Sequence, residues 1–337
     1  MNAIRWPAEW EPQERVWFSW PHREDTWPEA LETLEQKFAT IITLAADVQN
    51  VSINACESLH DRIRKKVGTS ENIALHHHST NDVWCRDHGA TFVVKKEQLH
   101  AIDWSFNAWG GKFPPWDLDD AIAKKMALAA NATHYRSPIH LEGGTIEGNG
   151  NGVVLTTEAV ALNPNRNPEW DKLSVENEWK TTLGAETVFW LPKGIEGDDT
   201  DGHIDDIARF IREDVLIAAS DTHPASPNYK VLAENKERLQ DVKTRTNSTV
   251  EILEMPMPEP LYTKKWRLNT LPASYLNFLI LNNAILVPTF NQAKNDATAL
   301  GILRECFSGY KVTGIDCRDF IYEGGAIHCL SQQQPHT

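Results

Sequence analysis

Residues 152–157 read GVVLTT, a short apolar run that begins with glycine and ends on threonine. Three similar runs occur in the chain: ATFVV at 90–94, DVLIAAS at 214–220 and NAILVPT at 283–289. Their starts lie about 62, 62 and 69 residues apart, and a helix-like segment follows each run. Recurrence at a nearly constant spacing is typical of a fold built from repeated units. The four runs therefore predict similar short strands in such units.

Apolar residues recur at three- and four-residue steps in four other segments, which predicts amphipathic helices at 30–48, 117–132, 228–242 and 295–306. A second repeat supports the units, because LEGGTIEG at 141–148 and YEGGAIHC at 322–329 share an E-G-G-x-I core. Strands alternate with helices throughout, so the predicted class is α/β with short mixed sheets. A ring of such units would leave a central cavity lined by strand ends and glycine loops.

Composition narrows the class of protein. No stretch of the 337 residues resembles an interdomain linker, so we expect a single domain over residues 1–337. The formal net charge of −14 argues against nucleic acid or an anionic membrane as partner and is compatible with a cationic ligand. The chain has neither a signal-peptide core nor eighteen consecutive apolar residues, which predicts a cytoplasmic protein.

One of the five cysteines stands in an unusual place. The five are widely spaced without a CxxC or disulfide-framework pattern, so we expect reduced thiols. Cys329 closes the YEGGAIHC motif on a segment that we expect to be extended. It is either a nucleophile or a small buried apolar residue, as free cysteine often is. Neighbouring side chains on a strand point to opposite faces, so a base for Cys329 must come from elsewhere than His328.

The stretch TDGHIDDIARF at 200–210 supplies a candidate base. Its apolar alternation favours an extended segment, on which His203 and Asp205 would face the same side. The alternative is a surface loop rich in aspartate.

Two further motifs carry acidic residues at comparable places. Trp84 and Asp87 directly precede the apolar run at 90–94, where strand ends carry functional groups; the alternative is a structural ion pair with Arg86. Glu142 holds the place in LEGGTIEG that Glu323 holds in YEGGAIHC.

Together these residues suit attack on a guanidinium, a planar cation. Asp87 and Asp205 would pair with its N–H groups and hold its carbon over the sulfur of Cys329. His203, kept protonated by its acidic surroundings, would donate a proton to the departing ammonia and later deprotonate water. Flat faces for the cation or its alkyl stem would come from two tryptophans, Trp84 and Trp109.

The chain resembles the agmatine deiminase family, within the guanidine-modifying superfamily that also contains arginine deiminases and bacterial-type peptidylarginine deiminases. The resemblance runs almost from end to end and rests on WPAEWEPQERVWFSWPH, NDVWCRDHGATFV, FNAWGGKFPPWDLDD, LEGGTIEGNG, DTDGHIDDIARF and GGAIHCLSQQQP. It implies a five-bladed α/β propeller, the pentein fold. It also implies Cys329 as covalent nucleophile, His203 as acid and base, and Asp87 and Asp205 as guanidinium ligands. The prediction includes no metal and no cofactor, and its substrate-binding candidates are Trp84, Glu142, Trp109, Asp201 and Gly325.

The chain departs from the family pattern beside the nucleophile, where Glu323 replaces a glycine, and in a shortened segment at 112–114. That segment shows no arginine pair for a carboxylate, so the predicted substrate is agmatine. The products would be N-carbamoylputrescine and ammonia, which would place the protein in polyamine synthesis. Lys112 and Arg166 leave free or peptidyl arginine as the alternative substrate.

Other functions stay open from the sequence. A zinc hydrolase could use LHHHSTND at 75–82, but on a strand only His76 and His78 share a face, and no HExxH accompanies them. A non-catalytic binding module would hold a guanidine without releasing ammonia. An amidinotransferase would use an amine in place of water as acceptor. Oligomeric state is open, with a homo-oligomer as one option.

Overall fold

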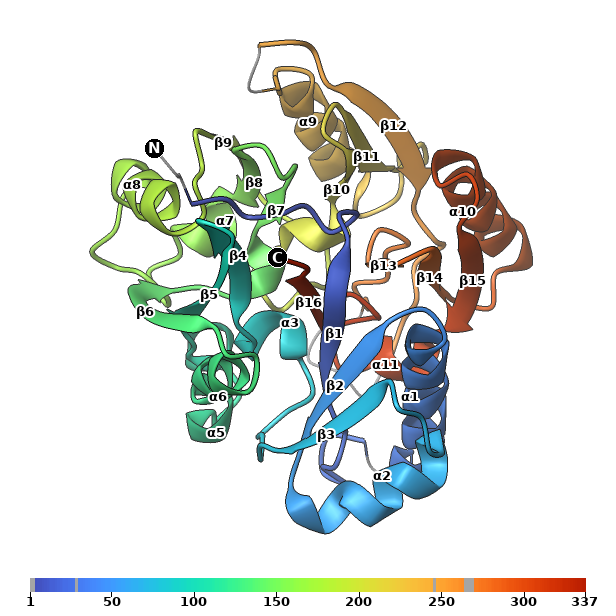
Figure 1. Cartoon of the computed structure of the whole chain (residues 1–337). Coiled ribbons are helices and arrows are strands. Elements are labelled where there is room, and N and C mark those ends of the chain that lie inside the picture. Colours follow the sequence, from blue (N-terminus) through green and yellow to red (C-terminus); the bar gives the residue numbers. More distant parts are fainter. Residues whose placement is uncertain (1–3, 28–29, 245–246, 264–269) are drawn as a thin grey trace.

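A computed structural model describes residues 4–27, 30–244, 247–263 and 270–337. Within these residues the strands form five small sheets with both parallel and antiparallel pairing. Figure 1 shows the sheets arranged around a common centre, with the longer helices on the outside. The predicted α/β class with short mixed sheets is confirmed, and the arrangement agrees with a five-bladed α/β propeller.

Four of the sheets follow one plan, in which the first strand is antiparallel to the middle strand and the middle strand is parallel to the third. Their strands are β4 (Thr91–Lys95), β5 (Gln98–Ser105), β6 (Thr133–His140); β7 (Glu147–Gly148), β8 (Val153–Thr157), β9 (Thr187–Leu191); β10 (Ala208–Arg212), β11 (Val215–Ser220), β12 (Glu251–Pro256); and β13 (Leu279–Leu281), β14 (Ala284–Thr289), β15 (Lys311–Asp316). All of β8 and nearly all of β11 and β14 is buried, as expected for strands covered on both faces.

The fifth sheet joins the two ends of the described chain. Its order is β16 (Ser331–Pro335), β1 (Gln13–Ser19), β2 (Asn50–Ala55) and β3 (Ile73–His77), and β16 runs antiparallel to β1. Although β16 reads SQQQP, all five of its residues are buried. Two of its amides find partners: Trp17 Nε1 donates to Gln334 Oε1 at 3.0 Å, and Arg86 Nη1 donates to Gln333 Oε1 at 2.6 Å. These contacts hold the polar strand in place two residues after Cys329.

Three of the four predicted helices form nearly as expected: α1 (Leu31–Ala46), α9 (Tyr229–Leu239) and α10 (Ala293–Cys306). The segment 117–132 instead splits into α5 (Asp117–Asp120) and α6 (Ile122–Ala129). Asp119 explains the break, because its Oδ1 accepts from the backbone N–H of Asn81 and so ties the short first helix to another segment. The remaining helices are α2 (His60–Val67), α3 (Cys85–His88), α4 (Ala108–Gly111), α7 (Glu158–Ala161), α8 (Lys172–Thr182), α11 (Arg318–Ile321) and the 3₁₀ turns η1 (Glu57–Leu59), η2 (Gly143–Thr145) and η3 (Ile204–Asp206).

The repeat predicted from the four apolar runs needs one correction. All four form strands, but the run at 90–94 becomes β4, the first strand of its sheet, whereas the other three become the middle strands β8, β11 and β14. The true counterpart of those strands is β5, whose first three residues are exposed or half-buried. That half of β5 is free to carry polar residues, so its sequence does not resemble the other middle strands.

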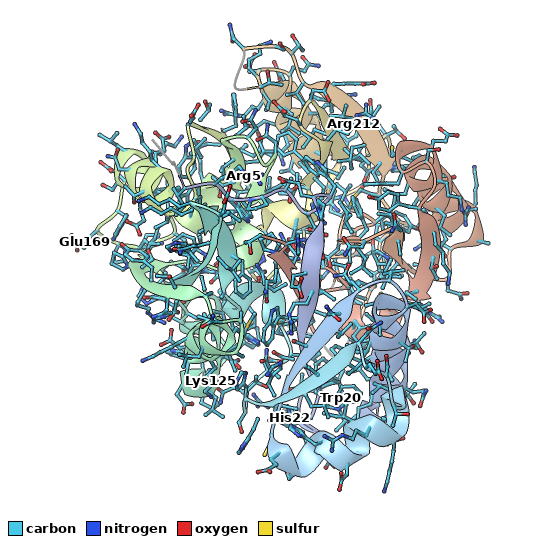
Figure 2. The ribbon with its side chains drawn as sticks, in the orientation of Figure 1. Arg5, Trp20, His22, Lys125, Glu169 and Arg212 are labelled. Carbon is cyan, nitrogen blue, oxygen red and sulfur yellow. The ribbon has the colours of Figure 1, made fainter. Side chains whose placement is uncertain are left out.

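A short turn precedes the first strand of several sheets and brings side chains to the centre of the ring. These turns include α3 before β4, η2 before β7, η3 before β10 and residues 327–330 before β16. The turn α3 packs against η2, and η2 packs against η3. Side chains fill the middle of the ring, while charged residues such as Glu169 and Arg212 lie at its rim (Figure 2). None of the helices in the described segments combines the length and the apolar character needed to span a membrane.

Candidate active site

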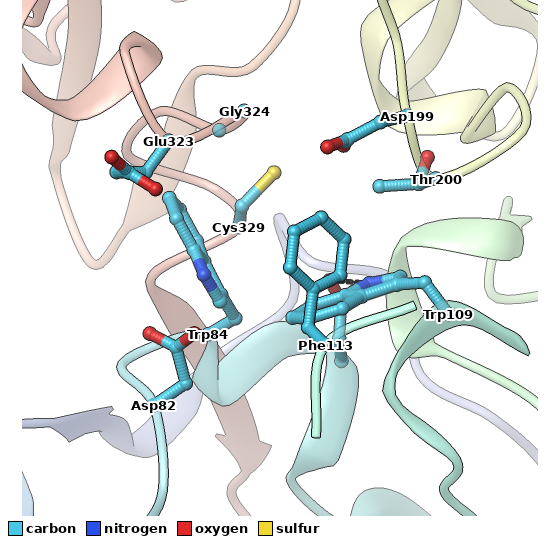
Figure 3. A pocket seen from close by; sticks show the side chains of 11 residues that line it. Asp82, Trp84, Trp109, Phe113, Asp199, Thr200, Glu323, Gly324 and Cys329 are labelled. Carbon is cyan, nitrogen blue, oxygen red and sulfur yellow. Dashed lines mark hydrogen bonds between the residues drawn. The ribbon is translucent and has the colours of Figure 1, made fainter. Parts of the chain in front are cut away.

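A cavity with about 410 Å³ of empty volume opens at the centre of the ring. Figure 3 shows the sulfur of Cys329 pointing into it, between the rings of Trp84 and Phe113 and the loop that carries Asp199 and Thr200. The lining combines aromatic rings, carboxyl groups and the thiol: Asp82, Trp84, Asp87, Trp109, Phe113, Asp199, Thr200, Glu323, Gly324, Gly325 and Cys329.

Cys329 lies in a turn just before β16, and not on the extended segment expected from the sequence. Its side chain is 5% exposed. The Nδ2 of Asn277 lies 3.0 Å from the sulfur, and Oδ2 of Asp205 lies 3.8 Å from it. Burial, followed by the charges of Asp205 and Asp206, raises the pKa of the thiol well above its usual value. The free thiol is therefore protonated near neutral pH.

Asp87 is held rigidly in α3, against the same cavity. Trp109 Nε1 donates to its Oδ2 at 3.1 Å, and the backbone N–H of Gly144 donates to its Oδ1 at 3.1 Å. Trp109 itself adopts a left-handed backbone conformation with φ 56°, which turns its indole toward the carboxylate. Burial raises the pKa of Asp87 to about 6, against the nearby positive charge of His203. Asp87 thus does not form the structural ion pair with Arg86 that the sequence left as an alternative.

His203 begins η3 and is buried, with 1% of its surface exposed. Its Nδ1 lies 3.8 Å from Asp87 Oδ1, and its Nε2 lies 3.6 Å from Glu142 Oε2. Burial lowers the pKa of the imidazole, but the charges of Asp87 and Glu142 outweigh it and raise the pKa to about 10. The ring is therefore an imidazolium, a proton donor, near neutral pH.

Asp205 is fully buried in η3, two residues further on. The segment is a 3₁₀ turn and not the extended stretch predicted, so the inference from alternation was wrong about the backbone. Both residues nevertheless reach the centre of the ring, because the turn itself lies there. Asp205 Oδ2 lies 2.7 Å from Nδ1 of His328. Burial acts to raise the pKa of Asp205, but the contact with His328 and its charge lower it overall.

Two glycines of the repeated E-G-G-x-I core are explained by close approach. A Cβ on Gly144 would lie 2.4 Å from His203 Nδ1 and 3.0 Å from Asp87 Oδ1. A Cβ on Gly325 would lie 2.4 Å from the Trp84 ring and 3.0 Å from the Cβ of Cys329. At each glycine the 2.4 Å distance is shorter than real Cβ contacts. Each glycine therefore makes room for residues of the site.

Four of the predicted site residues are not among those that line the cavity: Glu142, Asp201 and the buried pair His203 and Asp205. Glu142 is buried behind His203, where Arg166 Nε donates to its Oε1 at 2.9 Å. Asp201 is half-buried, forms an ion pair with Arg166 and lies 2.7 Å from Lys112 Nζ. Lys112 and Arg166 are thus engaged by acidic residues, and neither lines the cavity. Trp84, Trp109 and Gly325 do line it, as predicted.

Sequence reasoning missed Asn277. Besides its contact with the sulfur, its Oδ1 accepts from the backbone N–H groups of His328 and Cys329 at 3.0 and 3.2 Å. Asn277 stands two residues before β13, in the segment that leads into the first strand of its sheet, as Asp87 does four residues before β4. The acidic residues Asp82, Asp199 and Glu323 of the lining were not predicted as binding residues either.

The histidines of the zinc alternative lie elsewhere. The rings of His76 and His78 stack with centroids 5.3 Å apart, so they do share a face. His76 Nε2 contacts Ser52 Oγ at 3.0 Å, and His78 Nδ1 contacts Asn54 Oδ1 at 2.9 Å. Within the described segments, no three histidine, cysteine or acidic side chains are grouped so that they could hold a metal ion.

Comparisons with known proteins identify the family of the chain. The model of the Porphyromonas-type peptidyl-arginine deiminase family matches residues 5–335. The agmatine deiminase of Pseudomonas aeruginosa strain LESB58 is 34% identical, over 99% of this chain and 96% of its own. The agmatine deiminase of Medicago truncatula is 33% identical, over 99% and 97% of the two chains. A solved structure of the agmatine deiminase of Enterococcus faecalis superposes with a TM-score of 0.94 at 30% identity, over 99% of this chain and 97% of that one.

The family match spans nearly the whole chain, and the relatives are covered over nearly their whole length. The resemblance inferred from the motifs is confirmed, and the chain shares the fold of the solved agmatine deiminase structure, with which a five-bladed propeller agrees. The chain belongs to the Porphyromonas-type peptidyl-arginine deiminase family, and over nearly its whole length it is similar to agmatine deiminases.

Proposed function

We propose that the protein is an agmatine deiminase, a hydrolase that converts agmatine to N-carbamoylputrescine and ammonia through an amidino intermediate on Cys329. The full-length similarity to agmatine deiminases supports the reaction. One observation carries the mechanism: the Cys329 sulfur and the Asp87 carboxyl group line one cavity, and Asp205 Oδ2 lies 3.8 Å from the sulfur.

In this mechanism Asp87 and Asp205 bind the N–H groups of the guanidinium and hold its carbon over the sulfur. Carboxylates match a planar cation with paired, charge-assisted hydrogen bonds, which fix its orientation as well as its position. The raised pKa of Cys329 then has a role, because the bound cation offsets the negative charges that oppose a thiolate. Substrate binding would therefore lower the pKa of the thiol, and its proton would leave to solvent.

The thiolate then attacks the guanidinium carbon to give a neutral tetrahedral adduct. His203, as imidazolium, donates its proton to one terminal amino group, which leaves as ammonia while a thiouronium cation remains on Cys329. Neutral His203 next takes a proton from a water that attacks the same carbon. The adduct collapses by breaking the carbon–sulfur bond and losing a proton, which gives the ureido product and the thiolate.

The rest of the cavity favours agmatine over arginine. Three carboxyl groups line it beyond the thiol, on Asp82, Asp199 and Glu323, and among the residues that the structure describes, no lysine, arginine or histidine lines it. Such a lining attracts the second positive charge of agmatine and repels the α-carboxylate of free arginine. Free or peptidyl arginine remains the second candidate because of the family's description.

The test is ammonia release from agmatine, free arginine and a peptide with a C-terminal arginine, with the Cys329→Ala variant as control. We expect the highest kcat/KM for agmatine and loss of ammonia release in the variant. Equal rates on all three substrates would contradict the assignment of agmatine. Adding a primary amine separates hydrolysis from amidino transfer, since only a transferase would form a new guanidine. The cytoplasmic location, the homo-oligomer and the absence of nucleic-acid and membrane partners stay predictions.

A further inference from the structure

His328, which the mechanism above does not use, is buried between two carboxyl groups. Its side chain is 2% exposed. Nδ1 lies 2.7 Å from Asp205 Oδ2, and Nε2 lies 2.8 Å from Glu9 Oε2. Asp205 and Glu9 are buried as well. The three side chains form a continuous chain from the Cys329 sulfur to the first part of the sequence.

This geometry fixes the number of protons in the chain. Each of the two short contacts needs one hydrogen between its nitrogen and its oxygen. A neutral imidazole carries a single N–H. If both carboxyl groups were ionised, its other ring nitrogen would direct a lone pair at a carboxylate oxygen that also carries only lone pairs. The chain Glu9–His328–Asp205 must therefore hold two protons among its three groups. Either the ring is an imidazolium, or one of the carboxyl groups is protonated.

The charges around the chain decide where the second proton lies. Arg209 Nη2 contacts Glu9 Oε2 at 2.7 Å, Arg86 Nη2 lies 3.8 Å from it, and Arg209 Nε contacts Glu147 Oε2 at 3.0 Å. Arg209, the charge and hydrogen bond of His328, and Arg86 together hold the pKa of Glu9 well below its usual range despite its burial, so Glu9 is ionised.

With Glu9 ionised, the second proton lies on His328 or on Asp205. Burial, followed by the charges of Arg209 and Arg86, lowers the pKa of His328 overall, although Glu9 and Asp205 act to raise it. The pKa of Asp205 is also lowered, through its contact with His328. Two ring nitrogens within 2.8 Å of two anionic oxygens are the stronger constraint, and they place the proton on the ring.

We propose that His328 is a positioning residue that acts through Asp205. Its protonated ring lies between Asp205 and Glu9 and donates to both carboxylates. The hydrogen bond to Asp205 keeps that carboxylate charged and fixed beside the Cys329 sulfur. Asp205 Oδ1 is buried and has no hydrogen-bond partner in the described part of the chain, so it is left for a ligand's N–H. This inference rests on the proposed function, in which Asp205 binds the guanidinium.

Two reagents that alkylate Cys329 test this without any turnover. The cation 2-chloroacetamidine resembles a guanidinium, whereas iodoacetamide is neutral and of similar size. The ratio of their rates measures the attraction of the site for a cation. In His328→Leu we expect this ratio to fall by about tenfold or more, the value of one charge-assisted hydrogen bond. In His328→Asn, whose amide still donates to Asp205, the fall should be smaller.

The pH dependence separates positioning from a merely structural role. Without its donor, the buried Asp205 has a higher pKa, so the cation preference of His328→Leu should be regained as the pH rises. A structural role would slow both reagents alike at every pH. The matched control is His76→Asn, a half-buried histidine on β3, whose ratio should equal that of the wild type.

A direct measurement covers variants that fail to fold. In the ¹⁵N spectrum of histidine-labelled wild-type protein, we expect both ring nitrogens of His328 to be protonated near neutral pH. A neutral ring at 328, or an unchanged reagent ratio in folded His328→Leu, overturns the proposal. If the wild type prefers the cationic reagent but releases no ammonia from any guanidine, the proposed function is wrong and the role of His328 stands.

Discussion

Among the acidic residues of the cavity lining, we expect Glu323 to affect substrate choice most. It lines the cavity together with Asp82 and Asp199. Burial, followed by the charges of Asp82 and Asp199, raises the pKa of Glu323 to about 8. Burial and Asp119 raise the pKa of Asp82 to about 7. Carboxyl groups with pKa values raised in this way are protonated in the empty cavity near neutral pH and lose the proton when a cation binds beside them.

We predict that Glu323→Gln raises the KM for agmatine by about fivefold to tenfold, the effect of one partly screened ion pair. The KM for n-butylguanidine, which lacks the second charge, should stay within about twofold. Steady-state kinetics on both substrates measure this, with Glu97→Gln on the exposed surface as control. Equal increases for the two substrates would mean that Glu323 does not contact the distal amine.

The same carboxyl groups predict how agmatine binding changes with pH. Below about pH 7, both Asp82 and Glu323 are protonated and neutral. As the pH rises through about 8, both become anionic, so the KM for agmatine should fall relative to that for n-butylguanidine. A ratio of the two KM values that stays constant from pH 6 to 9 would contradict the assigned pKa values.

At the scale of elements, the turns before the first strands set the geometry of the site. Gly144 in η2 is the sharpest probe, because any Cβ there would press on His203 and Asp87. We predict that Gly144→Ala lowers kcat by about a hundredfold, since misplacement by about 1 Å can cost that much. The control is Gly301→Ala in α10, where a Cβ meets nothing within 4 Å. That variant should keep full activity and gain about 0.5–1 kcal/mol in its free energy of unfolding.

The sequence predicted elements with a strong apolar period and missed those set by distant contacts. Helix α1 follows from its buried stripe, which includes Leu34, Phe38 and Ile41. The break between α5 and α6 depends on Asp119 contacting residues almost forty positions away, which no local pattern reveals.

The site shows the same division. Cys329, His203, Asp87 and Asp205 stood in recognisable motifs, and the structure brings them to one centre. Asn277 lies in no motif that the sequence indicated, and Glu9 lies in the first motif without a predicted role; only the closed ring places them beside Cys329 and His328. Glu142 and Asp201 also stood in these motifs, but both form ion pairs with Arg166 and neither lines the cavity.

At the scale of the whole molecule, the closing of the ring by β16 on β1 ties the nucleophile to the N-terminal part of the chain. We propose that residues 1–337 form one domain, as the absence of a linker predicted. Unfolding in guanidinium chloride should then give one transition, coincident by circular dichroism and by tryptophan fluorescence. Two separated transitions would show that parts of the ring unfold independently.

The claim on which the account depends is a covalent bond between Cys329 and the guanidine carbon. It is tested most directly by acid-quenching the protein during turnover of agmatine and weighing the peptide that contains Cys329. We predict a mass increase equal to agmatine minus ammonia on that peptide, and its absence in Cys329→Ser. Ammonia release at the wild-type rate from Cys329→Ala, with no adduct on any cysteine of the wild type, would contradict the account.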